Sequence, residues 1–197
     1  MKILVRGPAL TRSGYGEHTR FLLRSLRSSE VPLDIYLHTT NWGETGWIKD
    51  DDEERSWIDS LLVKTIDYSQ KNGTYDVSFQ VTIPNEWERL APVNIGVTAG
   101  IESTKVSPIW LEKTNMMDKI IVVSEHAKAG FMNTVYKAID QNTKQERVLR
   151  AETPIHVVHY PVKKFKKTKL DLDFDTDFNF LAMAQWGPRK NLINTTT

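Results

Sequence analysis

The sequence predicts an α/β protein in which a parallel sheet carries helices on both faces. Short apolar runs alternate with longer segments of helical periodicity as far as residue 158, and this alternation is typical of parallel sheets. With 197 residues, of which 40% are hydrophobic, the chain is long enough for one such domain and part of another.

The predicted strands are short apolar or alternating runs that are bounded by turn residues. The first strand, Ile3–Val5, comes directly before Arg6, Gly7 and Pro8. The later strands are predicted over residues 33–37, 75–83, 93–98, 119–123 and 155–158. Because the carboxyl ends of parallel strands share one edge of a sheet, the loops that follow them are expected to form the ligand-binding edge.

The predicted helices have apolar residues on one side and charged residues elsewhere. They are expected over residues 17–27, 50–67 and 108–117, with a fourth that begins after Ser124. This fourth helix is expected to place five apolar or aromatic residues near one face: Ala127, Phe131, Val135, Tyr136 and Ile139. The polar stretch 142–150 that follows it is expected to be a surface loop or a frayed helix end.

The end of the chain predicts the opening of a second α/β unit. Residues 178–185 form an apolar run that is typical of a buried strand, and a basic turn and a helix start are expected after it. The domains predicted are therefore 1–162, a linker over 163–177 whose first half is basic and second half acidic, and an incomplete second domain over 178–197.

Composition excludes some classes of function and leaves others open. Lys and Arg number 26 against 25 Asp and Glu, and this balance argues against a dedicated nucleic-acid-binding protein. The absence of cysteine excludes disulfides, thiolate metal sites and thiol nucleophiles. We expect a cytoplasmic protein with no transmembrane segment, because no apolar run approaches the ~20 residues needed to cross a bilayer.

The first candidate site is the stretch Gly14, Tyr15, Gly16 and Glu17, which the sequence places in and after a loop between the first strand and the first helix. Glycines let the backbone approach a ligand and present N–H groups to an anion. The stretch lacks the third glycine of a dinucleotide-binding loop and the lysine of a phosphate-binding P-loop. A plain turn explains it equally well.

The second candidate site is the loop after the fourth strand, in which Glu102 and Thr104 offer a carboxylate and a hydroxyl. The alternative is that one of them only caps the next helix. Ser124 and His126 could also indicate nucleophilic catalysis. Helix capping by Ser124 is the favoured interpretation, because the strand-to-helix turn that exposes a nucleophile is missing.

The third candidate site is the basic turn that carries Arg189 and Lys190, whose cations suit a diphosphate at a strand–helix junction. A solvated basic turn is the alternative. No metal site is predicted, because the acidic run 50–52 is explained as a helix start.

These segments together resemble the retaining glycosyltransferases with two Rossmann-like domains, known as the GT-B architecture, and within them the large group-1 family, also called family 4. Three groups of residues carry the resemblance. They are the GYGEHTR run at 14–20, the pattern from Thr98 to Phe131 that includes Glu102, Pro108, Trp110 and Glu125, and Gln185-Trp186 with Arg189-Lys190-Asn191.

The resemblance implies transfer of a sugar from a nucleotide-sugar donor to an acceptor, with retained anomeric configuration and no cofactor or bound metal. It assigns Lys190, with Arg189 beside it, to the donor diphosphate, and the first two candidate loops to the cleft between the domains. Gln185 stands where the family usually has an arginine. The paired glutamates of the family would lie farther along the second domain, so no catalytic residue is assigned.

Two expectations follow from the incomplete second domain. The isolated chain should bind donor weakly and not turn over. Its apolar strand at 178–185 should also pack on its own sheet or pair with another copy, since an unpaired strand edge promotes association. The alternative function is a non-catalytic module that binds a nucleotide or sugar phosphate at the same edge, and a dinucleotide oxidoreductase domain is a weaker third reading.

Overall fold

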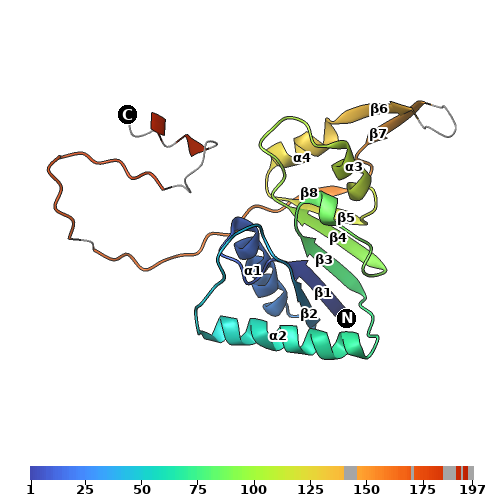
Figure 1. Cartoon of the computed structure of the whole chain (residues 1–197), viewed down its shortest axis with the longest axis horizontal. Coiled ribbons are helices and arrows are strands. Elements are labelled where there is room, and N and C mark those ends of the chain that lie inside the picture. The colour runs from blue at the N-terminus through green and yellow to red at the C-terminus, as the bar shows by residue number, and fades with distance from the viewer. Residues whose placement is uncertain (140–145, 170, 184–189, 192, 195–197) are drawn as a thin grey trace. The chain divides into compact units, whose positions relative to one another are not determined.

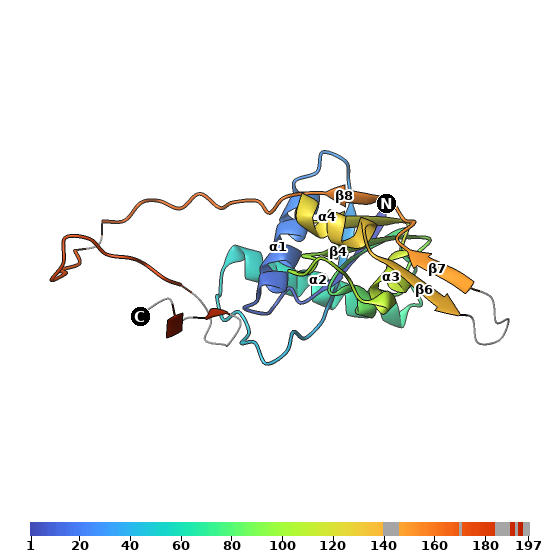
Figure 2. The same cartoon turned by 90° about the horizontal axis from the view of Figure 1, so that it is seen from above.

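The computed structural model describes residues 1–197 except 140–145, 170, 184–189, 192 and 195–197. The chain divides into two compact units, Met1–Pro161 and Val162–Thr197. The first unit holds every strand of the described residues, and its arrangement is shown in Figures 1 and 2. The boundary lies one residue from the predicted end of the first domain, while the linker over 163–177 stays a prediction.

Six parallel strands form the central sheet of the first unit (Figure 1). Their order in space is β2-β1-β3-β4-β5-β8. The strands are β1 (Lys2–Gly7), β2 (Asp34–Thr39), β3 (Val77–Val81), β4 (Val93–Thr98), β5 (Lys119–Val122) and β8 (Ile155–Val157). The chain moves outward from β1 to β2 and then returns to the other side of β1, so the order of strands reverses between β1 and β3. Ligands of open α/β sheets bind in the crevice at such a reversal.

The helices that connect these strands are α1 (Gly14–Arg27), α2 (Glu53–Gln70), α3 (Pro108–Thr114) and α4 (Glu125–Met132). Between β3 and β4 the connection has only a short 3₁₀ turn, η1 (Pro84–Glu86). Asp52 begins α2 by accepting a hydrogen bond from the backbone N–H of Arg55 at 2.7 Å, and Glu53 and Glu54 favour its positive end.

The register of the sheet proves that helices cover both faces. Val5, Phe79 and Ile95 are paired across neighbouring strands and therefore share one face. Leu23 of α1 packs in the same apolar cluster as Val5. On the opposite face, Ile120 packs with residues of α3 and α4. The predicted fold class, a Rossmann-like α/β sheet with helices on both faces, is confirmed.

The helix predicted to continue to Ile139 is wrong. Helix α4 ends at Met132, and the chain then forms an antiparallel hairpin of β6 (Val135–Ile139) and β7 (Glu146–Arg150). Burial along β6 follows the two-residue period of a strand and not the period of a helix. Val135 and Ile139 are exposed, while Tyr136 packs against the core. The loop predicted over 142–150 is correspondingly wrong from Glu146 onward.

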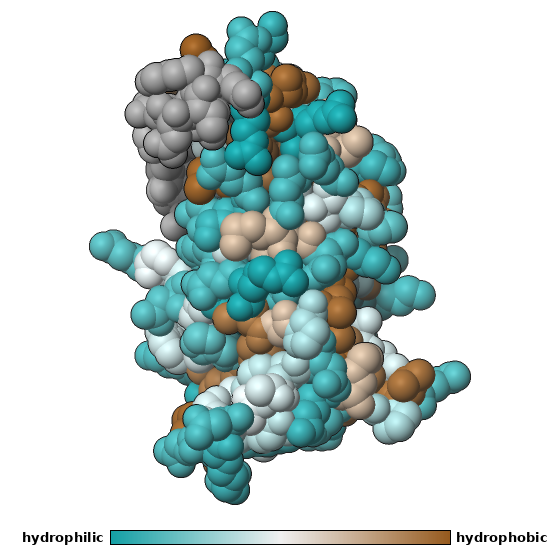
Figure 3. Space-filling model, turned by 90° about the vertical axis from the view of Figure 1, so that its right-hand side faces the viewer, coloured by the Kyte–Doolittle hydropathy of each residue, from teal (hydrophilic) through white to brown (hydrophobic). Residues whose placement is uncertain are grey.

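Exposed hydrophobic residues occur on several elements of the first unit, among them Val63 of α2 and Val148 of the hairpin. Figure 3 shows one face of the molecule, on which hydrophilic residues predominate and hydrophobic ones emerge in small patches between them. Among the described residues, none of the helices is long and apolar enough to cross a membrane.

The strand predicted over 178–185 is not formed in its described part. Residues 178–183 have no regular structure, and the side chains of Phe180 and Leu181 are exposed. A strand needs a partner for its backbone N–H and C=O groups, and the described residues of the second unit provide no other strand. Residues 184 and 185 lie outside the described residues.

Candidate functional site

The first turn of α1 lies at the carboxyl edge of the sheet and contains the glycine-containing candidate. Residues 14–16, predicted as part of a loop, are helical. Ser13 caps the helix, and its hydroxyl oxygen accepts a hydrogen bond from the backbone N–H of Gly16 at 2.9 Å. A Cβ at Gly16 would lie 2.3 Å from the carbonyl oxygen of Thr11, whereas one at Gly14 would meet nothing within 4 Å. Gly16 is therefore required for packing, and Gly14 is the glycine with open space beside it.

Tyr15 joins the first candidate loop to the second. Its hydroxyl lies 2.8 Å from the hydroxyl of Thr98, the last residue of β4, and accepts a hydrogen bond from the backbone N–H of Ala99 at 3.2 Å. Its ring stacks on Trp42 with centroids 4.2 Å apart. Burial raises the pKa of the Tyr15 hydroxyl, so this group is protonated at neutral pH. The first turn of α1 and the end of β4, more than eighty residues apart in sequence, thus meet at one edge of the sheet.

Replacing Tyr15 by Phe is expected to destabilise the fold by about 1–2 kcal/mol, because the partly buried backbone N–H of Ala99 loses its acceptor. Thr98 keeps one partner, since it also accepts from the backbone N–H of Gly100 at 3.3 Å. Urea unfolding monitored by circular dichroism measures the change. Tyr75→Phe is the matched control, because the Tyr75 hydroxyl forms no hydrogen bond within the described residues. Equal losses in the two variants would contradict the assignment.

Glu17 faces the body of α1 and not the edge of the sheet. Its carboxylate pairs with Arg20 at 2.8 Å and with Arg24 at 3.0 Å. Burial opposes its ionisation, but hydrogen bonds from Arg24 and Arg20 outweigh burial and lower the pKa of Glu17. Arg24 also reaches Glu54 of α2, with Nη2 2.7 Å from Oε2. Glu17 therefore belongs to an ion network that ties α1 to α2.

The loop after β4 turns at Gly100, whose φ of +82° lies in the region that favours glycine. Beyond it Glu102 and Thr104 are exposed. Neither caps α3, because that helix begins at Pro108 with Ser107 before it. Glu102 and Thr104 therefore do not occupy the N-cap position of α3, and they stay candidates for contact with a ligand.

The remaining candidates have simpler outcomes. Ser124 accepts a hydrogen bond from the backbone N–H of Ala127 at 3.1 Å and so caps α4, as the capping interpretation predicts. Lys190 is exposed in the second unit, and Arg189 lies outside the described residues. In the part of the chain that the structure describes, no three His, Cys, Asp or Glu side chains are grouped to hold a metal ion.

Sequence reasoning missed three threonines at the point where the strand order reverses. Thr39 is the last residue of β2, Thr40 follows it, and Thr82 follows β3, so the three lie on either side of the end of β1. Their hydroxyl groups are buried and form no hydrogen bond within the described residues. A threonine at the end of a strand is too common to attract notice in a sequence, and only the sheet order brings these three to neighbouring positions.

His18 is the other residue that the sequence did not single out as a site. Its imidazole is only 9% exposed and meets the ring of Tyr160 edge-on, with centroids 4.8 Å apart. Nδ1 of His18 has no hydrogen-bond partner in the described part of the chain. Burial lowers the pKa of His18 to about 4, so the ring is neutral at pH 7.

Comparison with known proteins found no relative of this chain. No protein-family model, no curated protein and no solved structure matches the chain.

Proposed function

We propose that this chain is the acceptor-side domain of a nucleotide-sugar-dependent glycosyltransferase, with the start of the domain that binds the donor. The observation that carries the proposal is the hydrogen bond between Tyr15 and Thr98. It brings the turn at Gly14 and the loop of Glu102 and Thr104 to the carboxyl edge of a parallel sheet, where such sheets bind ligands. The family resemblance of the sequence supports the same assignment.

In this proposal each group has a separate task. The open backbone at Gly14 approaches the donor phosphate or the acceptor, and Glu102 and Thr104 contact the substrates from the loop after β4. Arg189 and Lys190 stabilise the nucleotide diphosphate as it departs, since fixed cations lower the energy of developing negative charge. The bond between the sugar C1 and the diphosphate breaks, and C1 bonds to the acceptor oxygen on the same face of the sugar. The acceptor proton leaves with the diphosphate.

The first test is donor binding by the isolated chain. Saturation-transfer NMR with UDP-glucose and GDP-mannose is expected to detect weak binding of at least one donor and no transfer to water or acceptor. Lys190→Ala should abolish this binding, while Lys166→Ala, which removes another exposed lysine, should leave it unchanged. Robust sugar transfer by the isolated chain would contradict the expectation that the donor site is incomplete.

The second test separates the enzyme from the alternative, a non-catalytic module that binds a nucleotide or sugar phosphate. A form of the protein that continues into a complete second nucleotide-binding domain should transfer sugar, and Lys190→Ala should lower that rate by about 100-fold. Tight binding of a nucleotide or sugar phosphate without transfer in such a form would favour the module instead. Chelation of metal with EDTA should leave the transfer rate unchanged.

A further inference from the structure

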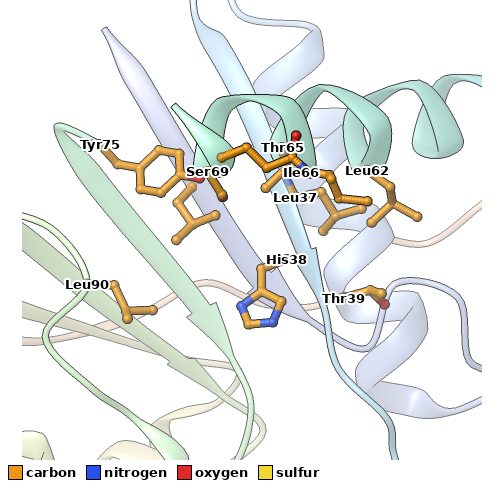
Figure 4. Close-up of a pocket in the computed structure, with 11 residues that line it drawn as sticks. Leu37, His38, Thr39, Leu62, Thr65, Ile66, Ser69, Tyr75 and Leu90 are labelled. Atoms are coloured by element: carbon orange, nitrogen blue, oxygen red, sulfur yellow. The ribbon is translucent and has the colours of Figure 1, made fainter. Parts of the chain in front are cut away.

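A groove of about 600 Å³ lies between α2 and the connection that leads from β3 to β4 (Figure 4). It is lined by Leu4 and His38 of the sheet, by Leu62 and Ile66 of α2, and by Leu90 of the connection. The volume falls within the range of about 300–1,000 Å³ that small-molecule sites occupy. The lining is mostly apolar with a few polar groups, which is also typical of such sites.

The wall at Leu90 belongs to the β3–β4 connection, which has the short η1 turn in place of an α-helix. Residues 87–90, after η1, have no regular structure, and two buried side chains hold them in place. Gln80 accepts a hydrogen bond from the backbone N–H of Glu88 at 3.0 Å and donates one to its carbonyl oxygen at 2.5 Å. Asn94 accepts from the backbone N–H of Leu90 at 2.8 Å. The Leu90 wall is therefore fixed before any ligand arrives, which reduces the entropy that binding costs.

His38 supplies the polar end of the groove. Figure 4 shows its imidazole projecting from β2 into the space between Leu90 and the helix. The ring forms no hydrogen bond within the described residues, and neither does the buried hydroxyl of the adjacent Thr39. Arg6 and Glu88 are the charged groups that act on His38, and burial followed by Arg6 lowers its pKa. A neutral imidazole has one N–H donor and one acceptor nitrogen, which together match a hydroxyl group.

The charges around His38 favour an uncharged ligand. Arg6 already donates to the carbonyl oxygen of Glu86 at 2.7 Å, and its other nitrogen lies 3.8 Å from the carboxylate of Glu88. An anionic ligand would have to compete with Glu88 for Arg6, and a cationic ligand would meet Arg6 itself.

We propose that this groove binds an uncharged molecule with an apolar body and a hydroxyl group, such as an aryl-substituted alcohol, with the hydroxyl hydrogen-bonded to His38. The proposal rests on the groove alone and goes beyond the proposed sugar transfer. Burying the apolar body against Leu4, Leu62 and Leu90 supplies the affinity. The His38 ring is exposed in the free protein and has no hydrogen-bond partner within the described residues, and a hydrogen bond to it supplies the preference for a hydroxyl.

The test titrates the chain with 3-phenylpropan-1-ol and follows the C–H resonances of the His38 ring by NMR. A saturable shift with a Kd on the order of 1 mM is expected for a ligand of this size. The 1-fluoro analogue, which lacks the hydroxyl, should bind at least several-fold more weakly. The His38→Phe variant lacks the reporting ring, so its titrations are followed through the methyl resonances of Leu90. In this variant the alcohol and the fluoro analogue should bind with equal affinity.

Two variants on α2 test the location without touching the core. Ile66 lines the groove and is 60% exposed, and Val63 is 68% exposed but does not line it. Ile66→Asp should weaken binding of the alcohol by about tenfold or more, while Val63→Asp should leave it unchanged. The proposal is overturned if no saturable shift occurs in the unmodified chain, if the fluoro analogue binds as well as the alcohol there, or if the two aspartate variants weaken binding equally.

Discussion

Gly16→Ala is expected to destabilise the first unit by about 3 kcal/mol or more, whereas Gly14→Ala should change its stability by less than about 1 kcal/mol. A Cβ at position 16 would lie 2.3 Å from the carbonyl oxygen of Thr11 and 3.0 Å from that of Pro8. Both obstacles are backbone atoms, so relief requires the loop after β1 to move. Position 14 has no atom within 4 Å of such a Cβ.

Urea unfolding of the two variants beside the unmodified chain measures this difference. The two glycines are separated by one residue and lie in the same helical turn, so helix propensity acts on both alike. A loss at Gly14 as large as the loss at Gly16 would refute the assignment of Gly16 to packing. If Gly14→Ala leaves stability unchanged but weakens nucleotide-sugar binding, the open backbone at that position gains support as a ligand contact.

His18 is expected to make the protein acid-sensitive between pH 6.5 and about 4. Above pH 6.5 the ring is neutral in both the folded and the unfolded chain, so its contribution to stability is fully present. As the pH falls from 6.5 toward 4, the unfolded chain binds a proton that the buried ring does not. The free energy of unfolding therefore decreases through this window, by a total on the order of 3 kcal/mol.

His18→Phe should remove this part of the pH dependence and keep the edge-on contact with Tyr160. The free energy of unfolding in urea, measured at intervals from pH 7.5 to 4, gives the difference in slope between variant and unmodified chain. His126→Gln is the control, because His126 is exposed. Parallel curves for His18→Phe and the unmodified chain would show that the His18 ring titrates normally in the folded state.

The elements of the sheet could be predicted because each has a local signal. Ile35 and Leu37 alternate along β2, and Ile58 and Leu61 repeat at helical spacing along α2. The hairpin after α4 could not be predicted in this way. Val135 and Ile139 fit a helical face as well as an alternating strand, and the choice depends on the packing of Tyr136 against the core.

In the candidate site, too, the sequence indicated the local features but not the contacts between distant residues. The sequence identified Tyr15 and the loop after β4 as separate candidates, but nothing local indicated that the Tyr15 hydroxyl reaches Thr98. Glu17 had the chemistry of a ligand-binding carboxylate, and its neighbours Arg20 and Arg24 engage it instead.

The sequence by itself determined the order and type of most elements, because periodicity, helix capping and turn residues act over a few neighbouring positions. Only the tertiary structure decided which strands are adjacent, that Gly16 packs against Thr11 while Gly14 stays open, and that His18 is buried and neutral. The physical reason is that burial, close approach and hydrogen-bond pairing depend on atoms that are distant in sequence, whose positions are set when the apolar faces of the sheet are covered.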